Sequence, residues 1–286
     1  LADCIVAGGV ESMSSVPLGG LKYSANPDLA LDWPEAYSSM GITAELVAEK
    51  YGIDRVAMDE FGTESHRRAA EAIQSGRFTD EIIPVEIENT ALVNGKIVKT
   101  TEVVEVDDGV RASTTIDTLA RLRPAFKKDG PVTAGNSSQM TDGAAVSMVV
   151  SEEFLQKLGG EPMARFIAYA VKGVPPEIMG IGPVAAIPAV LEMASMSLDQ
   201  IELIELNEAF AAQALAVIRE LGLNREIINV NGGAIALGHP LGCTGAKLTA
   251  TLLHEMGRRG LRYGMVSMCI GGGMGAAGIF ERLNKA

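Results

Sequence analysis

A histidine and a cysteine lie in two glycine-rich segments near the end of this chain. The first segment is Asn231-Gly-Gly-Ala-Ile-Ala-Leu-Gly-His239-Pro-Leu-Gly-Cys-Thr-Gly245, and the second is Cys269-Ile-Gly-Gly-Gly-Met-Gly275. Glycine lets the backbone approach a ligand closely and aim its N–H groups at it. A thiol and an imidazole held in such turns are typical of acyl transfer, where sulfur serves as nucleophile or base.

Each of these residues also fits a purely structural role. His239 fits a cap at a helix N-terminus, and Cys269 fits a small buried strand residue, as most free cysteines are. Asn207-Glu208 fits the start of a helix, and Gly271–Gly273 alone is a weak phosphate-loop signal without a Walker lysine pattern. We expect the other two histidines, His66 and His254, to lie on solvated helix faces, and the other two cysteines, Cys4 and Cys243, to pack in the interior.

Composition limits the classes of protein and partner. The chain has 286 residues, of which 47% are hydrophobic and 21% charged, as is typical of a globular protein. A net charge of −12 argues against a general nucleic-acid or membrane-surface binder, and no apolar run reaches the length of a membrane span. The three cysteines include no Cys-x-x-Cys pair, so we expect neither a metal site nor a disulfide framework, and a reducing compartment is the simpler environment.

The first residues are unusual for the start of a protein. Cys4-Ile-Val-Ala-Gly-Gly9 is typical of a buried strand that runs into a turn, and Leu1 is the first residue. A buried parallel strand needs neighbouring strands, so we expect the chain to be a fragment of a longer protein. A targeting presequence is left open for the same reason.

Strands and helices alternate in the last part of the chain. Apolar runs predict strands at 165–174, 201–206, 227–230, 265–270 and 276–280. Helical spacing predicts a helix at 183–196, a second helix from Phe210 to Leu221, and a third with Leu248, Leu252 and Met256 facing inward. This order predicts an α/β fold that winds right-handed around a mostly parallel sheet.

The beginning of the chain contains a weak echo of its end. Cys4-Ile-Val-Ala-Gly-Gly is similar to Met268-Cys-Ile-Gly-Gly-Gly, and Gly143-Ala-Ala-Val is similar to Gly275-Ala-Ala-Gly. The two members are nearly adjacent at the end, but over a hundred residues separate them at the beginning. A duplicated αβ unit with an insertion in its first copy explains this spacing. Within the insertion we expect a helix at 54–75.

Several motifs together resemble the thiolase family over essentially the whole chain. They are Ala7-Gly-Gly-Val-Glu-Ser-Met-Ser14, Met40-Gly-Ile-Thr-Ala-Glu45, Leu122-Arg-Pro-Ala-Phe126, Thr133-Ala-Gly-Asn-Ser-Ser138, Asn207-Glu-Ala-Phe210 and the segments around His239 and Cys269. The resemblance implies the thiolase fold, with two αβαβαββ halves, of which the first carries an inserted loop domain and is incomplete here. It implies that residues 1–12 and 141–160 are the remainder of the N-terminal half, 13–140 the inserted CoA-binding loop domain, and 161–286 the C-terminal half.

The resemblance also implies roles for four residues of a catalytic site. Cys269 matches the acid/base cysteine that protonates the acetyl-CoA enolate and later deprotonates CoA, and a thiol suits both tasks because its reference pKa is about 8.5. His239 matches the histidine that supports the nucleophilic thiolate and helps bind a thioester oxygen, and Asn207 matches the asparagine that holds a water in the same oxyanion hole. Gly271 matches a backbone donor of a second oxyanion hole. The family's nucleophilic cysteine, in a Cys-x-Ser context, has no match here, so we expect residues 1–286 alone to be inactive.

Coenzyme A is implied as a co-substrate, without a tightly bound cofactor or a metal. The residues that match positions along its pantetheine arm, near its nucleotide and near the acyl end are Ala134, Ser138, Arg111, Met40, Met179 and Phe210. Acyl-CoA and CoA are the implied partners, with no nucleic acid and no membrane. Thiolases resemble one another in being dimers or tetramers, so we expect this protein to form a homodimer or homotetramer. We expect a cytoplasmic bacterial protein, with mitochondrial and peroxisomal locations left open.

Within the family, two segments are most similar to degradative 3-ketoacyl-CoA thiolases, Tyr169-Ala-Val-Lys-Gly-Val-Pro-Pro-Glu-Ile-Met-Gly-Ile-Gly-Pro183 and Ser137-Ser-Gln139. We therefore expect an acetyl-CoA C-acyltransferase that cleaves 3-ketoacyl-CoA with CoA in fatty-acid β-oxidation. One alternative is biosynthesis of acetoacetyl-CoA from two acetyl-CoA, which acyl-chain profiling would separate. The other is a catalytically silent thiolase-like protein that binds acyl-CoA or lipid. The presence of Cys269, His239 and Asn207 together argues against it.

Overall fold

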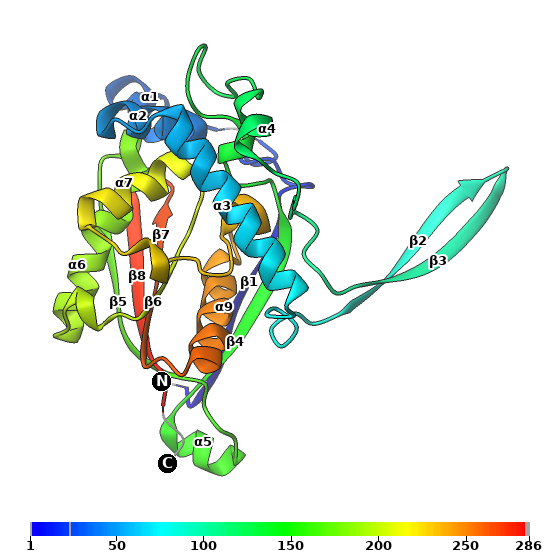
Figure 1. The fold of residues 1–286 in the computed structure, drawn as a ribbon, viewed down its shortest axis with the longest axis vertical. Helices are drawn as coiled ribbons and strands as arrows, with labels where there is room; N and C mark the ends of the chain where they lie inside the picture. Colours follow the sequence, from blue (N-terminus) through cyan, green and yellow to red (C-terminus); the bar gives the residue numbers. More distant parts are fainter. Residues whose placement is uncertain (1, 23, 284–286) are drawn as a thin grey trace.

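The computed structural model describes residues 2–22 and 24–283 (Figure 1). Leu1 and residues 284–286, which belong to the first and last regions predicted above, lie outside the described residues. The helices are α1 (Pro27–Asp32), α2 (Met40–Tyr51), α3 (Arg55–Gln74), α4 (Ile116–Ala120), α5 (Glu152–Leu158), α6 (Gly182–Ala194), α7 (Ala211–Leu221), α8 (Ala234–Leu237) and α9 (Thr244–Arg259). The strands are β1 (Cys4–Ser12), β2 (Val85–Val93), β3 (Lys96–Val104), β4 (Asp142–Val150), β5 (Arg165–Gly173), β6 (Leu203–Leu206), β7 (Tyr263–Ile270) and β8 (Met274–Glu281).

A four-stranded sheet in the order β5-β8-β7-β6 forms the centre of the C-terminal part. In this sheet β5 pairs with β8, and β8 with β7, in antiparallel fashion, whereas β7 and β6 are parallel. The prediction of a mostly parallel sheet is therefore wrong for these strands. For β7 and β8 the reason is the short glycine turn after Ile270, because a tight turn joins consecutive strands as antiparallel neighbours.

The two faces of this sheet are covered by different helices (Figure 1). Ile204 and Leu206 of β6 pack into the main core with residues of α6 and α7. Leu203, which points the other way because side chains alternate along a strand, packs against α9. The predicted inward stripe of α9 is confirmed, since its buried residues include Leu248, Leu252 and Met256.

β1 and β4 form a separate antiparallel pair that packs against α9, with Cys4 opposite Val150. β7 and β8 are paired in the same sense, so the two echoing parts of the sequence have the same local arrangement. A Cβ on Gly9 would lie 1.8 Å from the carbonyl oxygen of Gly242, so this position requires glycine. The expectation of a buried strand at β1 is wrong for this structure, because none of its residues is buried. The apolar side chains of Ile5, Val6, Val10, Val146 and Met148 on β1 and β4 are exposed.

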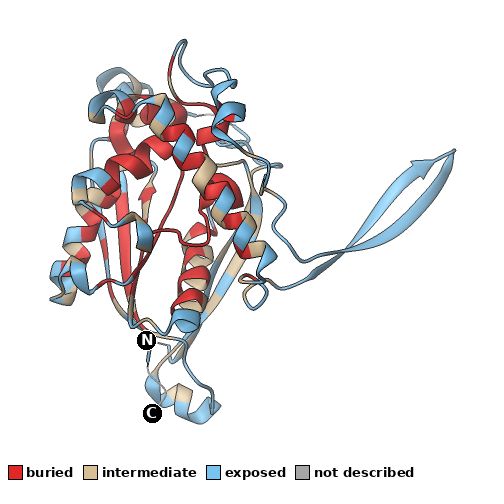
Figure 2. Cartoon of the chain, viewed as in Figure 1, coloured by how far each residue is buried: buried red, intermediate tan, exposed pale blue. Residues whose placement is uncertain are grey.

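The segment between β1 and β4 contains the predicted long helix and an extended hairpin. The helix predicted at 54–75 is confirmed as α3, whose N-cap Asp54 accepts a hydrogen bond from the N–H of Ala57. β2 and β3 pair along their whole length. Asn94 and Gly95 turn the chain with φ of 50° and 75°, the positive values that a tight two-residue hairpin turn needs. The hairpin projects from the body and is exposed throughout (Figure 2).

The strand predicted at 227–230 is absent from the structure of that segment. Arg225–Ile227 is a short 3-10 helix, and Ile228 makes an isolated parallel bridge to Ile204. Asn229 adopts a positive φ of 45°. Its side chain donates to the carbonyl of Leu206 at 2.7 Å and accepts from the N–H of Leu206 at 2.8 Å. A side-chain amide therefore replaces a neighbouring strand at the end of β6.

One helical stretch, Pro176–Ala194, is long and apolar enough by length and composition to cross a membrane, with a mean hydropathy of 1.4. The expectation that no apolar run reaches the length of a membrane span is therefore wrong for this stretch. Half of its apolar window is buried inside the fold. Ala186, Ile187 and Val190 pack in the main core with residues of β5, β7 and β8, so this stretch serves as a core helix of the sheet.

Candidate active site

Asn207 and Cys269 lie at the same edge of the central sheet. Asn207 directly follows β6, and Cys269 is the penultimate residue of β7, which runs parallel to β6. The carboxyl ends of parallel strands meet at one edge, where α/β folds place their ligands. The N–H of Asn207 donates to the carbonyl of Ser267 at 2.9 Å, which extends the pairing of the two strands by one residue.

His239 is held beside Asn207 through both ring nitrogens. Nδ1 lies 2.6 Å from Oγ1 of Thr244, and Nε2 lies 3.2 Å from Nδ2 of Asn207. The Thr244 hydroxyl donates its one hydrogen to the carbonyl of Pro240 at 2.9 Å, so toward the ring it can only accept. This pattern assigns the ring proton to Nδ1 and leaves Nε2 as an acceptor, which matches the amide donor of Asn207.

The backbone before the imidazole is fixed by a neighbouring segment. The N–H of His239 donates to Oγ1 of Thr141 at 3.1 Å, and the Thr141 hydroxyl donates to the carbonyl of Gln139 at 2.7 Å. Gly238 has a φ of +86°, and a Cβ on it would lie 2.4 Å from Oγ1 of Thr141. Glycine is required here by its backbone conformation and by the close approach of this threonine.

Burial keeps the imidazole neutral. Desolvation, with a smaller effect from the positive charge of Lys247, lowers the pKa of His239 to about 4. A neutral ring has a lone pair on Nε2, which here accepts only the 3.2 Å hydrogen bond from the Asn207 amide and can take a proton from a thiol in its place. Once protonated there, the same nitrogen becomes a donor that can stabilise a developing oxyanion.

Asn207 has an unused acceptor in the interior. Its side chain is fully buried, and its Oδ1 has no hydrogen-bond partner among the described residues. An unpaired buried carbonyl oxygen costs about 1–3 kcal/mol. A water or a ligand that donates a hydrogen bond therefore fits at this atom, as the water-binding role expected for Asn207 requires.

Cys269 is buried in a small apolar cluster. Its neighbours in that cluster are Met40 from α2, Met179 from the 176–181 3-10 helix, and Ala209 and Phe210 from the loop after β6. Burial raises the pKa of Cys269 to about 12. The expectation of a pKa near the reference value of about 8.5 is therefore wrong for this site. The site holds Cys269 as a thiol, which is the form that donates a proton.

Gly271 begins the exposed turn between β7 and β8. A Cβ on Gly271 would meet no atom within 4 Å, so packing does not require glycine at this position. Gly273 differs, because it has a φ of +97° and its Cβ would lie 2.3 Å from the carbonyl oxygen of Val174. Packing therefore fixes the end of the turn and leaves the Gly271 backbone accessible.

The residues expected to contact coenzyme A fall into two groups. Met40, Met179 and Phe210 lie in the Cys269 cluster. Ser138 lies beside it, because its N–H donates to the carbonyl of Ala209 at 2.9 Å. The structure does not bring the other two, Ala134 and Arg111, into this cluster, and both are exposed.

His66, predicted on a solvated face, is buried and 4% exposed. Its Nδ1 accepts a hydrogen bond from the N–H of Arg111 at 3.1 Å, and burial lowers the pKa of His66 to about 4. The charged neighbours of His66 in the sequence lie on another side of α3. At helical spacing His66 falls on the buried stripe of that helix, which includes Met58, Gly62, Ser65, Ala69 and Ala72. His254, given the same assignment, is half-buried.

The glycine pair after Asn231 packs against protein. A Cβ on Gly233 would lie 2.1 Å from Cδ of Glu208, and one on Gly232 would lie 2.6 Å from the carbonyl oxygen of Ser65. The idea that these glycines open the backbone to a ligand is therefore wrong. Sequence reasoning missed three side chains that contact or support the site, Thr141, Glu208 and Thr244, and the one signal for Glu208 was its position next to Asn207.

Comparison with known proteins identifies both parts of the chain. The family model described as "Thiolase, N-terminal domain" matches residues 1–153, and "Thiolase, C-terminal domain" matches residues 160–282. A 3-ketoacyl-CoA thiolase of Bacillus subtilis is 56% identical over 280 residues, which are 98% of this chain and 72% of that protein. The peroxisomal 3-ketoacyl-CoA thiolase 2 of Arabidopsis thaliana is 48% identical over 98% of this chain, which spans 61% of that protein.

Solved structures give the same result for the fold. Human mitochondrial 3-ketoacyl-CoA thiolase in complex with CoA superimposes with a TM-score of 0.86 at 40% identity, covering 99% of this chain and 72% of that one. The dimeric peroxisomal thiolase of Saccharomyces cerevisiae superimposes with a TM-score of 0.85 at 41% identity, covering 98% and 69%. Sequence and structure agree over nearly the whole length, and this chain belongs to the thiolase family.

Proposed function

We propose that the full-length protein cleaves 3-ketoacyl-CoA with CoA, giving acetyl-CoA and an acyl-CoA shortened by two carbons, in the β-oxidation of fatty acids. The observation that carries this proposal is the neutral His239 paired with the buried Asn207, at the sheet edge that also holds the Cys269 thiol. Relatives that carry the name 3-ketoacyl-CoA thiolase, at 48–56% identity, support the substrate class.

In the proposed mechanism a cysteine thiolate attacks the 3-keto carbonyl, and His239 takes the thiol proton at Nε2. The bond between the second and third carbons breaks, and its electron pair remains on the second carbon as the enolate of acetyl-CoA. Cys269 gives its proton to that carbon. The resulting Cys269 thiolate then takes the proton of an incoming CoA thiol, whose sulfur attacks the acyl thioester and releases the shortened acyl-CoA. The attacking cysteine leaves as a thiolate and takes back the proton held at Nε2 of His239.

We assign the role of the attacking cysteine to none of the three cysteines in residues 1–286. Cys269 serves as the acid, Cys243 is 2% exposed at the start of α9, and Cys4 lies within β1. Residues 1–286 alone therefore do not complete the proposed reaction.

Coenzyme A enters the proposal as a co-substrate. Its thiol would reach Cys269 past Met40, Met179, Phe210 and Ser138, which the structure groups at one place. Ala134 and Arg111 would contact the outer parts of the molecule from the surface. The human relative crystallised in complex with CoA supports this ligand. We propose further that Gly271 N–H completes the second oxyanion hole.

The protein is also proposed to self-associate and to act in the bacterial cytoplasm. A yeast relative is described as dimeric, and the relative from Bacillus subtilis supports a bacterial setting. Peroxisomal and mitochondrial relatives keep those two compartments as alternatives.

The test is a chain-length series of 3-ketoacyl-CoA substrates with the purified full-length protein. The proposal expects CoA-dependent loss of the substrate and equal formation of acetyl-CoA with medium or long chains. Turnover confined to acetoacetyl-CoA would favour the biosynthetic alternative. Binding of acyl-CoA without any turnover would favour the catalytically silent alternative.

A further inference from the structure

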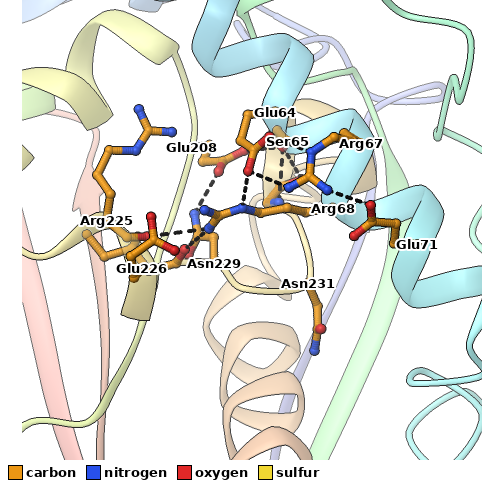
Figure 3. Close-up of polar contacts among 12 residues, drawn as sticks. Glu64, Ser65, Arg67, Arg68, Glu71, Glu208, Arg225, Glu226, Asn229 and Asn231 are labelled. Atoms are coloured by element: carbon orange, nitrogen blue, oxygen red, sulfur yellow. Dashed lines mark hydrogen bonds and ion pairs between the residues drawn. The ribbon is translucent and has the colours of Figure 1, made fainter.

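The carboxylate of Glu208, next to Asn207 in the chain, is buried and surrounded by hydrogen-bond donors (Figure 3). Oε2 accepts from the Ser65 hydroxyl at 2.7 Å and from the N–H of Ile235 at 3.3 Å. Oε1 accepts from Nδ2 of Asn229 at 2.8 Å. Burial raises the pKa of the Glu208 carboxyl, and the three hydrogen bonds from Ser65, Asn229 and Ile235 act against that rise. Among the described residues these three partners all donate, which is the arrangement that suits the acceptor-only carboxylate.

These contacts join three separate segments at one side chain. Ser65 lies on α3, Ile235 lies on α8 four residues before His239, and Asn229 is bonded to the main chain of Leu206 at the end of β6. The fit is close, because a Cβ on Gly233 would lie 2.1 Å from the carboxyl carbon. The Ser65 hydroxyl also accepts from the N–H of Gly233 at 3.1 Å.

The two catalytic segments meet at this carboxylate. Asn207 is the residue before Glu208, and the segment that ends in His239 is bonded to it through Ile235. The contact between Asn207 and His239 is 3.2 Å long, at the upper end of the normal range. A small shift of either segment would break it.

Helix α3 extends the connection to the segment expected to contact coenzyme A. His66, the residue after Ser65, accepts from the N–H of Arg111. Gln139 bonds the same segment to α8, because its Nε2 donates to the carbonyl of Gly109 at 2.8 Å and to that of Ala236 at 3.1 Å. The segment that contains Arg111 is therefore hydrogen-bonded both to α3, through His66, and to α8 before His239, through Gln139.

We propose that Glu208 is a positioning residue, whose buried carboxylate holds the Asn207 and His239 segments in the relative placement that thiolysis needs. The proposal rests on the proposed function, since it assigns Glu208 to the same reaction. Glu208 touches neither substrate nor the reacting atoms. It acts through Asn207 and His239, with Ser65 as its link to α3.

Glu208→Gln is the informative substitution, because it keeps the volume and removes one acceptor oxygen. If the new amide nitrogen takes the place of Oε1, it faces the Nδ2 donor of Asn229. If it takes the place of Oε2, it faces the N–H of Ile235. Asn229 cannot turn its amide to compensate, because both of its ends are bonded to Leu206. Either orientation puts donor against donor.

The experiment measures kcat and KM for thiolysis by the full-length protein, at a temperature where each variant is folded. Glu208→Gln should lower kcat by about 10- to 100-fold, the scale of a displacement of roughly 1 Å in a reacting geometry, with little change in KM. Glu281→Gln is the matched control, because Glu281 is also buried and multiply hydrogen-bonded but lies at the far end of β8. It should keep the wild-type kcat.

A double-mutant cycle separates positioning from general stability. In the Asn207→Ala background, Glu208→Gln should lower kcat by a much smaller factor than in the wild type, because the Asn207 side chain that Glu208 positions is already absent. Ser65→Ala, which removes one donor and leaves the carboxylate paired, should lower kcat by a smaller factor. Should Glu208→Gln not fold, Ser65→Ala with the same cycle carries the test.

A kcat of Glu208→Gln equal to that of Glu281→Gln, or full additivity with Asn207→Ala, would overturn the proposal. Failure of the proposed function gives a different result, because the wild-type full-length protein would then not turn over any 3-ketoacyl-CoA. The two failures are therefore distinguishable in one set of assays.

Discussion

Replacement of Thr244 by valine should slow thiolysis by the full-length protein, because it removes the hydrogen-bond partner of His239 Nδ1. Thr244 is 2% exposed, and its hydroxyl is the partner of His239 Nδ1 at 2.6 Å. Valine keeps the shape of the side chain but leaves the buried Nδ1–H unpaired. The ring can respond by turning away from Asn207. It can also move its proton to Nε2, where N–H then faces N–H of the Asn207 amide.

The size of the effect follows from the cost of an unpaired buried donor, about 1–3 kcal/mol. If this cost falls on the transition state, the rate drops by about 5- to 150-fold, since 1.36 kcal/mol is a factor of ten. The assay is kcat/KM for cleavage of a 3-ketoacyl-CoA by Thr244→Val. Thr244→Ser is the control, because it retains the hydroxyl and should keep most of the activity. Full activity of the valine variant, or an equal loss of activity in the serine variant, would refute the assignment of the His239 ring proton to Nδ1.

Three further predictions concern His239, His66 and the three cysteines of residues 1–286. His239→Ala in the full-length protein should lower the rate by roughly two orders of magnitude, because the site loses both a base and an oxyanion donor; near-full activity would make His239 a structural residue. The pKa of His66 is about 4 in the folded chain and 6.5 in the reference state. Between these two pH values the unfolded chain therefore binds more protons than the folded chain. The stability advantage of the wild type over His66→Gln should shrink as the pH falls from 6.5 toward 4. Denaturant unfolding at several pH values measures this, and a pH-independent difference would contradict it. A polypeptide of residues 1–286 alone should form no acyl-enzyme with a 3-ketoacyl-CoA, and a stable acyl adduct found by mass spectrometry would show that one of its three cysteines is the nucleophile.

The local elements were predictable where periodicity was strong. The stripe of Leu248, Leu252 and Met256 predicted α9 and its buried face, and the glycines after Ile270 marked the turn between two strands. The segment 227–230 failed because an apolar run fits a strand, whereas Asn229 supplies both hydrogen bonds through its side chain. Such a replacement depends on the distance to Leu206 in three dimensions, which the sequence does not contain.

The site was predictable in part for the same reason. Glycine-rich turns and the family motifs selected Cys269, His239 and Asn207, and the structure places Asn207 in contact with His239. The partners that set their protonation states were not predictable. Thr244 is five residues beyond His239 and faces it only because the turn folds back. The pKa of Cys269 is set by burial among residues from three distant segments.

The central claim, that Cys269 is the acid and base of a thiolase, is tested most directly by proton exchange. The methyl protons of acetyl-CoA should exchange with deuterium oxide in the presence of the full-length wild-type protein. In Cys269→Ser this exchange should be lost, because a serine hydroxyl is a far weaker acid than a thiol, while a thioester should still acylate a different cysteine, as mass spectrometry of the trapped protein would show. An acyl group on Cys269 in the wild type, or undiminished exchange in Cys269→Ser, would contradict the assignment.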